Sequence, residues 1–232
     1  MSTYLVTGAT RGIGRALVDE LAGDDLILMA RHSDTLTALC TSLPSARPVA
    51  VDFARPDGIA DAVDAAGLPD RLDGIVHSAG VSLRGRIAEM KPAEWTEQLT
   101  VNVVAVAELT RLVLPALRAA GGTVVFVNSG AGRRVIGTGG ASYAASKHAL
   151  VAVAEALRLE EPQVRVTTVF PGRVATDMQR ELRAYEGGDY RAGDYLRPAM
   201  VARIIAHALR LPGDATIPDV SVVPRPVSEQ AQ

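Results

Sequence analysis

The sequence predicts an α/β fold in which a doubly wound parallel sheet of about seven strands is covered by helices on both faces. Three observations lead there. Short apolar runs alternate with longer helical patterns, several of these runs are almost uninterrupted, and no repeat or low-complexity tract divides the 232 residues. Uninterrupted apolar runs are typical of strands buried on both faces, and strand–helix alternation gives right-handed crossovers. We therefore expect a single domain over residues 1–232.

The first part of the chain contains four predicted strands and three predicted helices. The strands are short β-like runs, the second of them almost wholly apolar, and they cover residues 3–7, 25–30, 46–51 and 74–78. Longer segments with helical patterning separate them. We expect these helices at residues 13–22, 33–41 and 57–66.

The second part continues the alternation with three helices and three strands. In chain order these cover residues 92–120, 122–128, 141–159, 164–170, 198–209 and 220–223. Pro92 suits the first turn of the longest helix, and Gly121 and Gly122 end it. The run from Val124 to Val127 is wholly apolar, as expected of a central strand.

Residues 176–197 break this alternation, because their periodicity is weak and they carry many charges and three tyrosines. A connection of this length is usually a lid or a binding loop. We expect a lid that orders over a bound substrate; the alternative is a permanently ordered helical pair with Tyr185, Tyr190 and Tyr195 packed in the core. The polar, Pro-rich residues 224–232 are expected to be frayed.

Composition narrows the functional classes. The chain has 24 Lys plus Arg against 26 Asp plus Glu, so no basic excess predicts binding to nucleic acid or to a membrane surface. A lone Cys40 predicts neither a disulfide nor a metal site, and His77 and His148 lack a second ligand at metal spacing. The first residues do not resemble a signal peptide. We expect a cytoplasmic location.

Three glycines stand where a phosphate could bind. Gly8, Gly12 and Gly14 follow the first predicted strand and open the first predicted helix. There, free backbone N–H groups and the positive end of the helix dipole can meet a dinucleotide pyrophosphate. A glycine at position 8 allows the tight turn, one at 12 the approach of a phosphate, and one at 14 close helix–strand packing. A lone glycine triplet would leave a simple turn as the alternative, but its position favours nucleotide binding.

The loop resembles the T-G-x-x-x-G-x-G motif of the short-chain dehydrogenase/reductase family. Further motifs of that family follow in the expected order over residues 3 to 223: Asn102 in the fourth helix, Ser129 after the fifth strand, Tyr143-Ala144-Ala145-Ser146-Lys147 as Y-x-x-x-K, and Pro171-Gly172-Arg173-Val174-Ala175-Thr176 as P-G-x-V-x-T. The resemblance implies a Rossmann fold, a nicotinamide cofactor and a small-molecule carbonyl or alcohol substrate.

The same resemblance implies the residues of the site. The expected catalytic residues are Asn102, Ser129, Tyr143 and Lys147. The expected cofactor-binding residues are Gly8, Thr10, Arg11, Gly12, Ile13, Gly14, Arg31, Asp52, Ala79, Gly80, Tyr143, Lys147, Pro171, Gly172, Val174 and Thr176.

The chain departs from the family pattern after the fourth strand. The usual N-N-A-G segment reads His77-Ser78-Ala79-Gly80 here. We expect altered support for the cofactor and the fourth helix rather than loss of binding. The chain is also somewhat short for the family.

The catalytic serine is displaced as well. Ser129 stands fourteen residues before Tyr143, one more than is usual, and Gly130 occupies the usual position. Ser142 would point away from its neighbour Tyr143 on a helix. We therefore assign Ser129 and expect the loop at residues 133–140 to hold the extra residue.

Tyr143 and Lys147 are one helical turn apart and share a helix face. A free tyrosine has a pKa of about 10, and an adjacent ammonium is expected to lower the pKa of Tyr143 so that the phenol serves as general acid and base. By resemblance, Lys147 also holds the nicotinamide ribose, Ser129 binds the substrate oxygen, and Asn102 anchors a water behind Lys147.

The end of the second strand favours NADP over NAD. Ala30 stands where an NAD site places a carboxylate for the ribose 2′-hydroxyl, while Arg31 and Arg11 could meet a 2′-phosphate. Asp34 could reach back, but it suits the first turn of the next helix.

Two other functions stay open. A dinucleotide-sensing regulatory or scaffold protein would keep the fold and cofactor without catalysis, and an extended-type epimerase or dehydratase would need a longer C-terminal region. Members of the family commonly assemble, so a homodimer or homotetramer is expected. The helix predicted at residues 92–120 has an apolar face that could serve this assembly or pack inside one subunit. It consists of Leu109, Leu112, Val113 and Leu117.

Overall fold

The computed structural model describes residues 1–31 and 34–225. The predicted helix start at residue 33 and all but the first two residues of the predicted tail lie outside these residues. Within them, predicted and observed boundaries agree within two residues, apart from the helix predicted at 92–120.

A seven-stranded sheet forms the centre of the molecule, with the strand order β3-β2-β1-β4-β5-β6-β7. All neighbouring strands are parallel, which confirms the predicted sheet. The strands are β1 (Thr3–Thr7), β2 (Asp25–Ala30), β3 (Ala46–Ala50), β4 (Gly74–His77), β5 (Thr123–Val127), β6 (Arg165–Pro171) and β7 (Asp219–Val222). The order reverses between β1 and β4, where doubly wound sheets form a crevice at the carboxyl ends of their strands.

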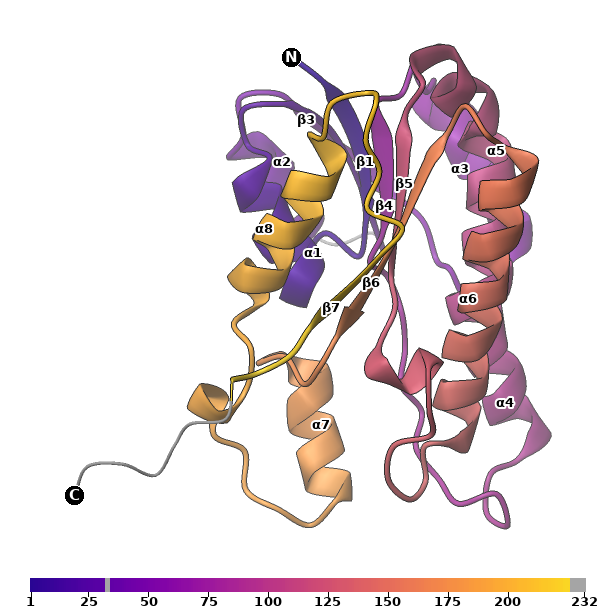
Figure 1. Cartoon of the computed structure of the whole chain (residues 1–232), viewed down its shortest axis with the longest axis vertical. Helices are drawn as coiled ribbons and strands as arrows, with labels where there is room; N and C mark the ends of the chain where they lie inside the picture. Colours follow the sequence, from indigo (N-terminus) through magenta and orange to yellow (C-terminus); the bar gives the residue numbers. More distant parts are fainter. Residues whose placement is uncertain (32–33, 226–232) are drawn as a thin grey trace.

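Helices cover both faces of the sheet. Figure 1 shows α1, α2 and α8 on one side and α3, α5 and α6 on the other, while α7 lies beyond the carboxyl ends of the strands. The helices are α1 (Gly12–Glu20), α2 (Asp34–Thr41), α3 (Ile59–Ala66), α4 (Pro92–Leu99), α5 (Ala105–Ala120), α6 (Ala141–Glu160), α7 (Asp177–Tyr185) and α8 (Pro198–Leu209). A 3₁₀ turn, η1 (Pro56–Gly58), precedes α3.

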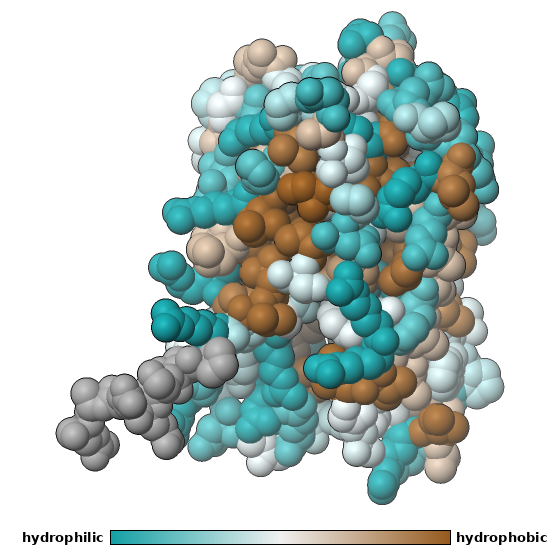
Figure 2. Space-filling model, in the orientation of Figure 1, coloured by the Kyte–Doolittle hydropathy of each residue, from teal (hydrophilic) through white to brown (hydrophobic). Residues whose placement is uncertain are grey.

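The apolar face suggested for self-association lies inside the subunit. Leu109, Val113 and Leu117 of α5 are at most 1% exposed and pack in the core between α5 and the sheet, with Leu112 packed against them. This face therefore stabilises the fold and is not available to a second chain. On the view of Figure 2, hydrophobic side chains gather instead over α8 and the adjoining part of the sheet.

The long helix predicted at residues 92–120 contains a π-helical segment, η2 (Thr100–Val104), between α4 and α5. Such insertions occur frequently at functional sites. The wider turn carries Asn102, which is fully buried. The whole segment Pro92–Ala120 has the length and hydropathy of a membrane span, but its apolar face is the one packed on the sheet.

Residues 176–197 are more ordered than their weak periodicity suggested. They form α7 and a 3₁₀ turn, η4 (Ala192–Asp194), and Leu196 pairs with Val174 in a short parallel bridge. Tyr185 is 43% exposed, while Tyr190 and Tyr195 are half-buried and stack with ring centroids 5.4 Å apart. The alternative of three tyrosines packed in the core is therefore wrong. The closing motion of a lid stays a prediction.

Candidate active site

A cavity of about 850 Å³ opens at the carboxyl ends of the strands, beside the reversal between β1 and β4. It collects residues from distant parts of the chain. Among the predicted residues, the cavity is lined by Gly8, Thr10, Arg11, Gly12, Ile13, Arg31, Asp52, Ala79, Gly80, Ser129, Tyr143, Lys147, Pro171, Gly172, Val174 and Thr176. Gly14 and Asn102 are not among its lining residues.

The glycine loop is packed too tightly for side chains. Gly8 has φ +67°, and a Cβ there would lie 2.9 Å from the backbone of Ala79. A Cβ on Gly14 would collide with the carbonyl oxygen of Gly8 and lie close to that of Thr7, so glycine at this position lets α1 pack closely against the end of β1 and the loop that follows it. The loop thus brings its own backbone to the cavity surface.

Ser78 is accommodated because this segment is held through its backbone. The Thr7 hydroxyl accepts hydrogen bonds from the N–H groups of Ser78 and Ala79, both at 3.0 Å. These bonds tie the end of β1 to the segment after β4. The side chain at position 78 is not needed for them, so the departure from N-N-A-G leaves this tie intact.

The start of α1 fits a phosphate group. Arg11 occupies the N-cap in extended conformation, no side chain of the described residues caps the helix, and no acidic residue stands in its first turn. The first N–H groups of a helix lack partners within the helix, and its dipole favours an anion there. Together with the glycine packing, this matches the pyrophosphate of a dinucleotide.

The far end of the cavity carries the groups that we expected beside the adenosine. Arg11 and Arg31 are exposed and line the cavity, and Ala30 is 8% exposed at the end of β2. Asp34 stands in the first turn of α2, as expected. The Asp52 carboxylate accepts a hydrogen bond from the N–H of Ala54 at 3.1 Å.

Three polar side chains meet in the middle of the cavity. Tyr143 and Lys147 lie on α6 and are 8% and 6% exposed. The Ser129 hydroxyl hydrogen-bonds to the Tyr143 phenol and accepts from the N–H of Ala131 at 3.1 Å. Ser142 is fully buried and faces the Leu83 carbonyl. The structure therefore brings Ser129, and not Ser142, to Tyr143.

The pKa of Tyr143 departs from our expectation. Burial raises the pKa of the phenol, while the hydrogen bond from Ser129 and the charge of Arg84 act in the opposite direction. The opposing charge is thus Arg84 rather than the predicted Lys147. Lys147 donates to the Val127 carbonyl at 2.9 Å, and burial lowers the pKa of its ammonium to about 8.

Asn102 acts behind the cavity wall. Its Oδ1 accepts from the N–H of Val81 at 2.9 Å, and its Nδ2 donates to the Val81 carbonyl and to the Ser146 hydroxyl, both at 3.0 Å. The amide is therefore occupied in joining the segment after β4 to α6. The side chain therefore fixes the backbone of Val81, and the water expected at Asn102 stays a prediction.

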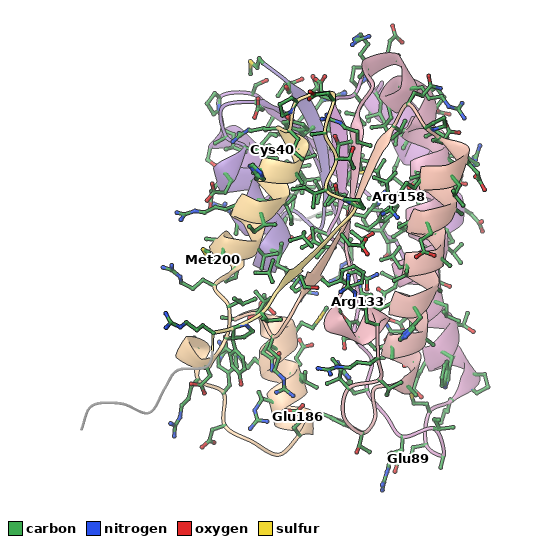
Figure 3. All side chains as sticks on the ribbon, viewed as in Figure 1. Cys40, Glu89, Arg133, Arg158, Glu186 and Met200 are labelled. Atoms are coloured by element: carbon green, nitrogen blue, oxygen red, sulfur yellow. The ribbon has the colours of Figure 1, made fainter. Side chains whose placement is uncertain are left out.

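Sequence reasoning missed two charged groups at the substrate end. The Arg84 guanidinium carbon lies 5.0 Å from the Tyr143 ring centroid, and Arg173 binds Glu186 through two hydrogen bonds of 2.9 and 2.6 Å. Figure 3 shows Glu186 at the end of α7 farthest from the sheet. Arg84 belongs to no motif and Arg173 fills a variable motif position, so the sequence offered no signal for either.

The histidines serve structure. His77 is buried, lies 2.9 Å from the Thr110 hydroxyl through Nε2, and stacks on Phe126. His148 Nδ1 lies 2.8 Å from the Ala144 carbonyl oxygen. Both imidazoles thus make packing or hydrogen-bond contacts within the subunit.

Comparisons with known proteins agree with this geometry. The chain is 34% identical over 95% of its length to glycine betaine reductase ATRR of Emericella nidulans, although it spans only 18% of that protein. It is 29% identical to the NADP-dependent 3-hydroxy acid dehydrogenase of Schizosaccharomyces pombe, with 96% of this chain and 92% of that protein covered.

A solved alcohol dehydrogenase from the archaeon Thermococcus sibiricus, complexed with 5-hydroxy-NADP, superimposes with a TM-score of 0.85 at 25% identity, covering 100% of this chain and 99% of that one. The family model described as short chain dehydrogenase matches residues 2–187. The chain therefore belongs to the short-chain dehydrogenase/reductase family and is an oxidoreductase of that family.

Proposed function

We propose that the protein is an NADP-dependent oxidoreductase that transfers a hydride between the nicotinamide and a carbonyl or secondary alcohol of a small molecule. The observation that carries this proposal is the meeting of Ser129, Tyr143 and Lys147 in one cavity with the glycine loop. A dinucleotide sensor would need the loop but not the three polar groups.

Each polar residue of the site has a separate role in the proposed reaction. The bound cofactor supplies the hydride. Tyr143 gives its phenolic proton to the carbonyl oxygen during reduction, or takes one from the alcohol in reverse. A free phenol has a pKa of about 10 and burial raises the pKa of Tyr143 above it, so the phenol carries its proton at neutral pH. Ser129 holds the substrate oxygen, and Lys147 holds the ribose hydroxyls.

Turnover is the direct test of this proposal. Oxidation of NADPH is followed with a panel of aldehydes and ketones, and the Tyr143→Phe variant serves as the control for adventitious reduction. At least one carbonyl should be reduced by the native protein and not by the variant. Turnover that survives in the variant would remove Tyr143 from the mechanism.

The preference for NADP rests on the adenosine end of the cavity. Arg11 and Arg31 offer positive charge to a 2′-phosphate, and Ala30 leaves no carboxylate at the end of β2. The Schizosaccharomyces pombe relative is named for NADP, and the Thermococcus sibiricus enzyme was solved with an NADP derivative. We expect NADP(H) to bind at least about tenfold more tightly than NAD(H), because each 1.4 kcal/mol of phosphate binding is worth a factor of ten.

Calorimetric titration with both cofactors measures this preference. The double variant Ala30→Asp, Arg31→Ala supplies the carboxylate that NAD sites use and removes one arginine, so it should move the preference toward NAD. Arg15→Gln, which changes an exposed arginine paired with Asp19 on α1, is the matched control. Equal affinities of the native protein for the two cofactors would contradict the NADP assignment.

A further inference from the structure

Arg84 is held in a fixed position beside the reacting groups. It follows a segment that two buried side chains fasten to the helices: Asn102 binds both backbone groups of Val81, and Gln98 accepts from the N–H of Leu83 at 2.8 Å. On its other side, the Gly85 N–H donates to the Gly139 carbonyl at 3.2 Å. The backbone around Arg84 is therefore pre-organised, which lowers the entropy cost of binding a ligand there.

The guanidinium itself has few partners. Its Nε donates to the Ser82 hydroxyl at 3.0 Å, and its face lies over the Tyr143 ring. Among the described residues, no carboxylate forms an ion pair with Arg84. The absence of a side chain at Gly140 leaves room for Nη1, since a Cβ there would lie 2.9 Å from it. A partly buried cation without a counter-ion is costly unless a ligand supplies the charge.

No acidic residue of the described cavity lining forms an ion pair with Arg84. Burial lowers the pKa of Arg84, and the charge of Glu186 acts in the opposite direction from a distance. The Glu186 carboxylate is itself bound by both Arg173 and Arg183, so this cluster carries a net positive charge. The other acidic lining residues are exposed and lie on other elements: Asp52 after β3, Glu97 on α4 and Asp177 in the first turn of α7.

We propose that Arg84 binds a carboxylate of the substrate, so that the protein acts on short oxo acids and the corresponding hydroxy acids. This rests on the proposed function, because it places the reacting carbonyl at Tyr143. The carboxylate is unchanged in the reaction: the carbonyl carbon takes the hydride and the carbonyl oxygen takes the proton of Tyr143. Arginine suits this role, because its planar fork matches the two oxygens of a carboxylate.

Matched pairs of substrates test the inference. Acetoacetate and its methyl ester carry the same ketone and differ in charge, and dihydroxyacetone phosphate presents a phosphate instead of a carboxylate. With NADPH as reductant, we expect kcat/KM for the acid to exceed that for the ester by at least about tenfold, since hydrogen bonds to charged groups contribute about 1.5–3 kcal/mol. The phosphate compound should be a poorer substrate than acetoacetate. Equal kcat/KM for the two would mean that the site accepts anions in general, and would overturn the assignment to a carboxylate.

The variant Arg84→Gln should reduce kcat/KM for the acid by about 10- to 100-fold and change that for the ester by less than about threefold. Arg84→Lys keeps the charge and should recover part of the loss. The matched control is Arg133→Gln, because Arg133 also lies over an aromatic ring, that of Phe170, but outside the cavity. An equal loss for acid and ester in Arg84→Gln would mean that Arg84 acts only through the pKa of Tyr143, and would overturn the inference.

A binding measurement separates this inference from the proposed function. Butanoate has no carbonyl to reduce and is titrated calorimetrically into the protein–NADP complex. Binding that disappears in Arg84→Gln and persists in Arg133→Gln supports the carboxylate site even if no ketone is turned over. Reduction of neutral ketones alone, with no butanoate binding, would leave the oxidoreductase in place and remove the carboxylate site.

Discussion

The two ends of the cavity are built in different ways. At the cofactor end, glycine backbone and strand ends form much of the surface, together with the exposed Arg11 and Arg31, and the parts behind it are buried core. At the substrate end, charged side chains such as Arg84 and Arg173 form the surface together with apolar ones such as Met178, and the ion pair of Arg173 and Glu186 is partly exposed. The cofactor end is fixed by the sheet, whereas the substrate end depends on contacts that water and salt can weaken.

This difference shows how one fold can keep its cofactor and change its substrate. A change at the cofactor end disturbs packing against the core, so it affects stability and binding together. A change at the substrate end alters side chains that the core does not need. We therefore expect substitutions at the two ends to differ in kind, and four variants measure that difference.

The largest effect is expected at Tyr143, where the two ends meet. Tyr143→Phe keeps the ring but removes the proton that the phenol would transfer, so kcat/KM should fall by about 10²- to 10⁴-fold. The affinity for NADP, measured by calorimetry, should stay within about twofold. Loss of cofactor binding in this variant would mean that the two ends are not separable at Tyr143.

The next largest effect is expected in the glycine loop. Gly8→Ala introduces a Cβ at positive φ, 2.9 Å from the backbone of Ala79, and should cost about 3 kcal/mol of unfolding free energy as well as most of the cofactor affinity. Gly193→Ala, within residues 176–197, is the matched control, because nothing lies within 4 Å of a Cβ there. Urea denaturation compares them, and equal losses would contradict the contrast between the two ends.

A smaller effect is expected on the pH dependence of the unfolding free energy, through the buried His77 in the core behind the cofactor end. Burial lowers the pKa of His77 to about 3. Since an unfolded histidine has a pKa of about 6.5, the unfolded state binds the proton first as the pH falls. The stability contributed by neutral His77 is present above about pH 6.5, is reduced by about 2 kcal/mol at pH 5, and is lost further as the pH falls toward 3.

His77→Gln tests this assignment through the slope of stability against pH. The fall in unfolding free energy between pH 7 and pH 5 should be smaller in this variant than in the native protein. His207→Gln, on the exposed side of α8, is the control and should keep the native slope. A native slope in both variants would show that His77 does not carry the acid sensitivity.

The smallest effect on stability, and the most local one, is expected at the substrate end. Glu186→Gln releases Arg173 and Arg183, so residues 176–197 should exchange their amide hydrogens faster while the sheet is unchanged. In the native protein these residues should exchange fast without ligand and slow with NADP and substrate, as a lid would. Glu20→Gln, which breaks an ion pair between α1 and α8, is the control. Strong protection without ligand would contradict the lid.

The sequence by itself determined what depends on neighbouring residues. The glycine loop, the helical turn that joins Tyr143 to Lys147, and the apolar runs of the strands all follow from local spacing, and the structure has them where the spacing predicted them. A backbone turn has the same geometry wherever it occurs. The cofactor end contains several such turns, so the sequence located most of the residues that line it, whereas Gly14 lies behind the lining.

Only the tertiary structure decided what depends on side chains from distant segments. It turned the apolar face of α5 into the core, joined Asn102 to Val81, and placed Arg84 rather than Lys147 as the charge that acts on the pKa of Tyr143. A periodic sequence pattern does not show such long-range contacts, because the packing of whole helices and loops determines them. The substrate end is formed by such contacts between distant segments. A long side chain can adopt many positions, and the packing of the fold selects one of them.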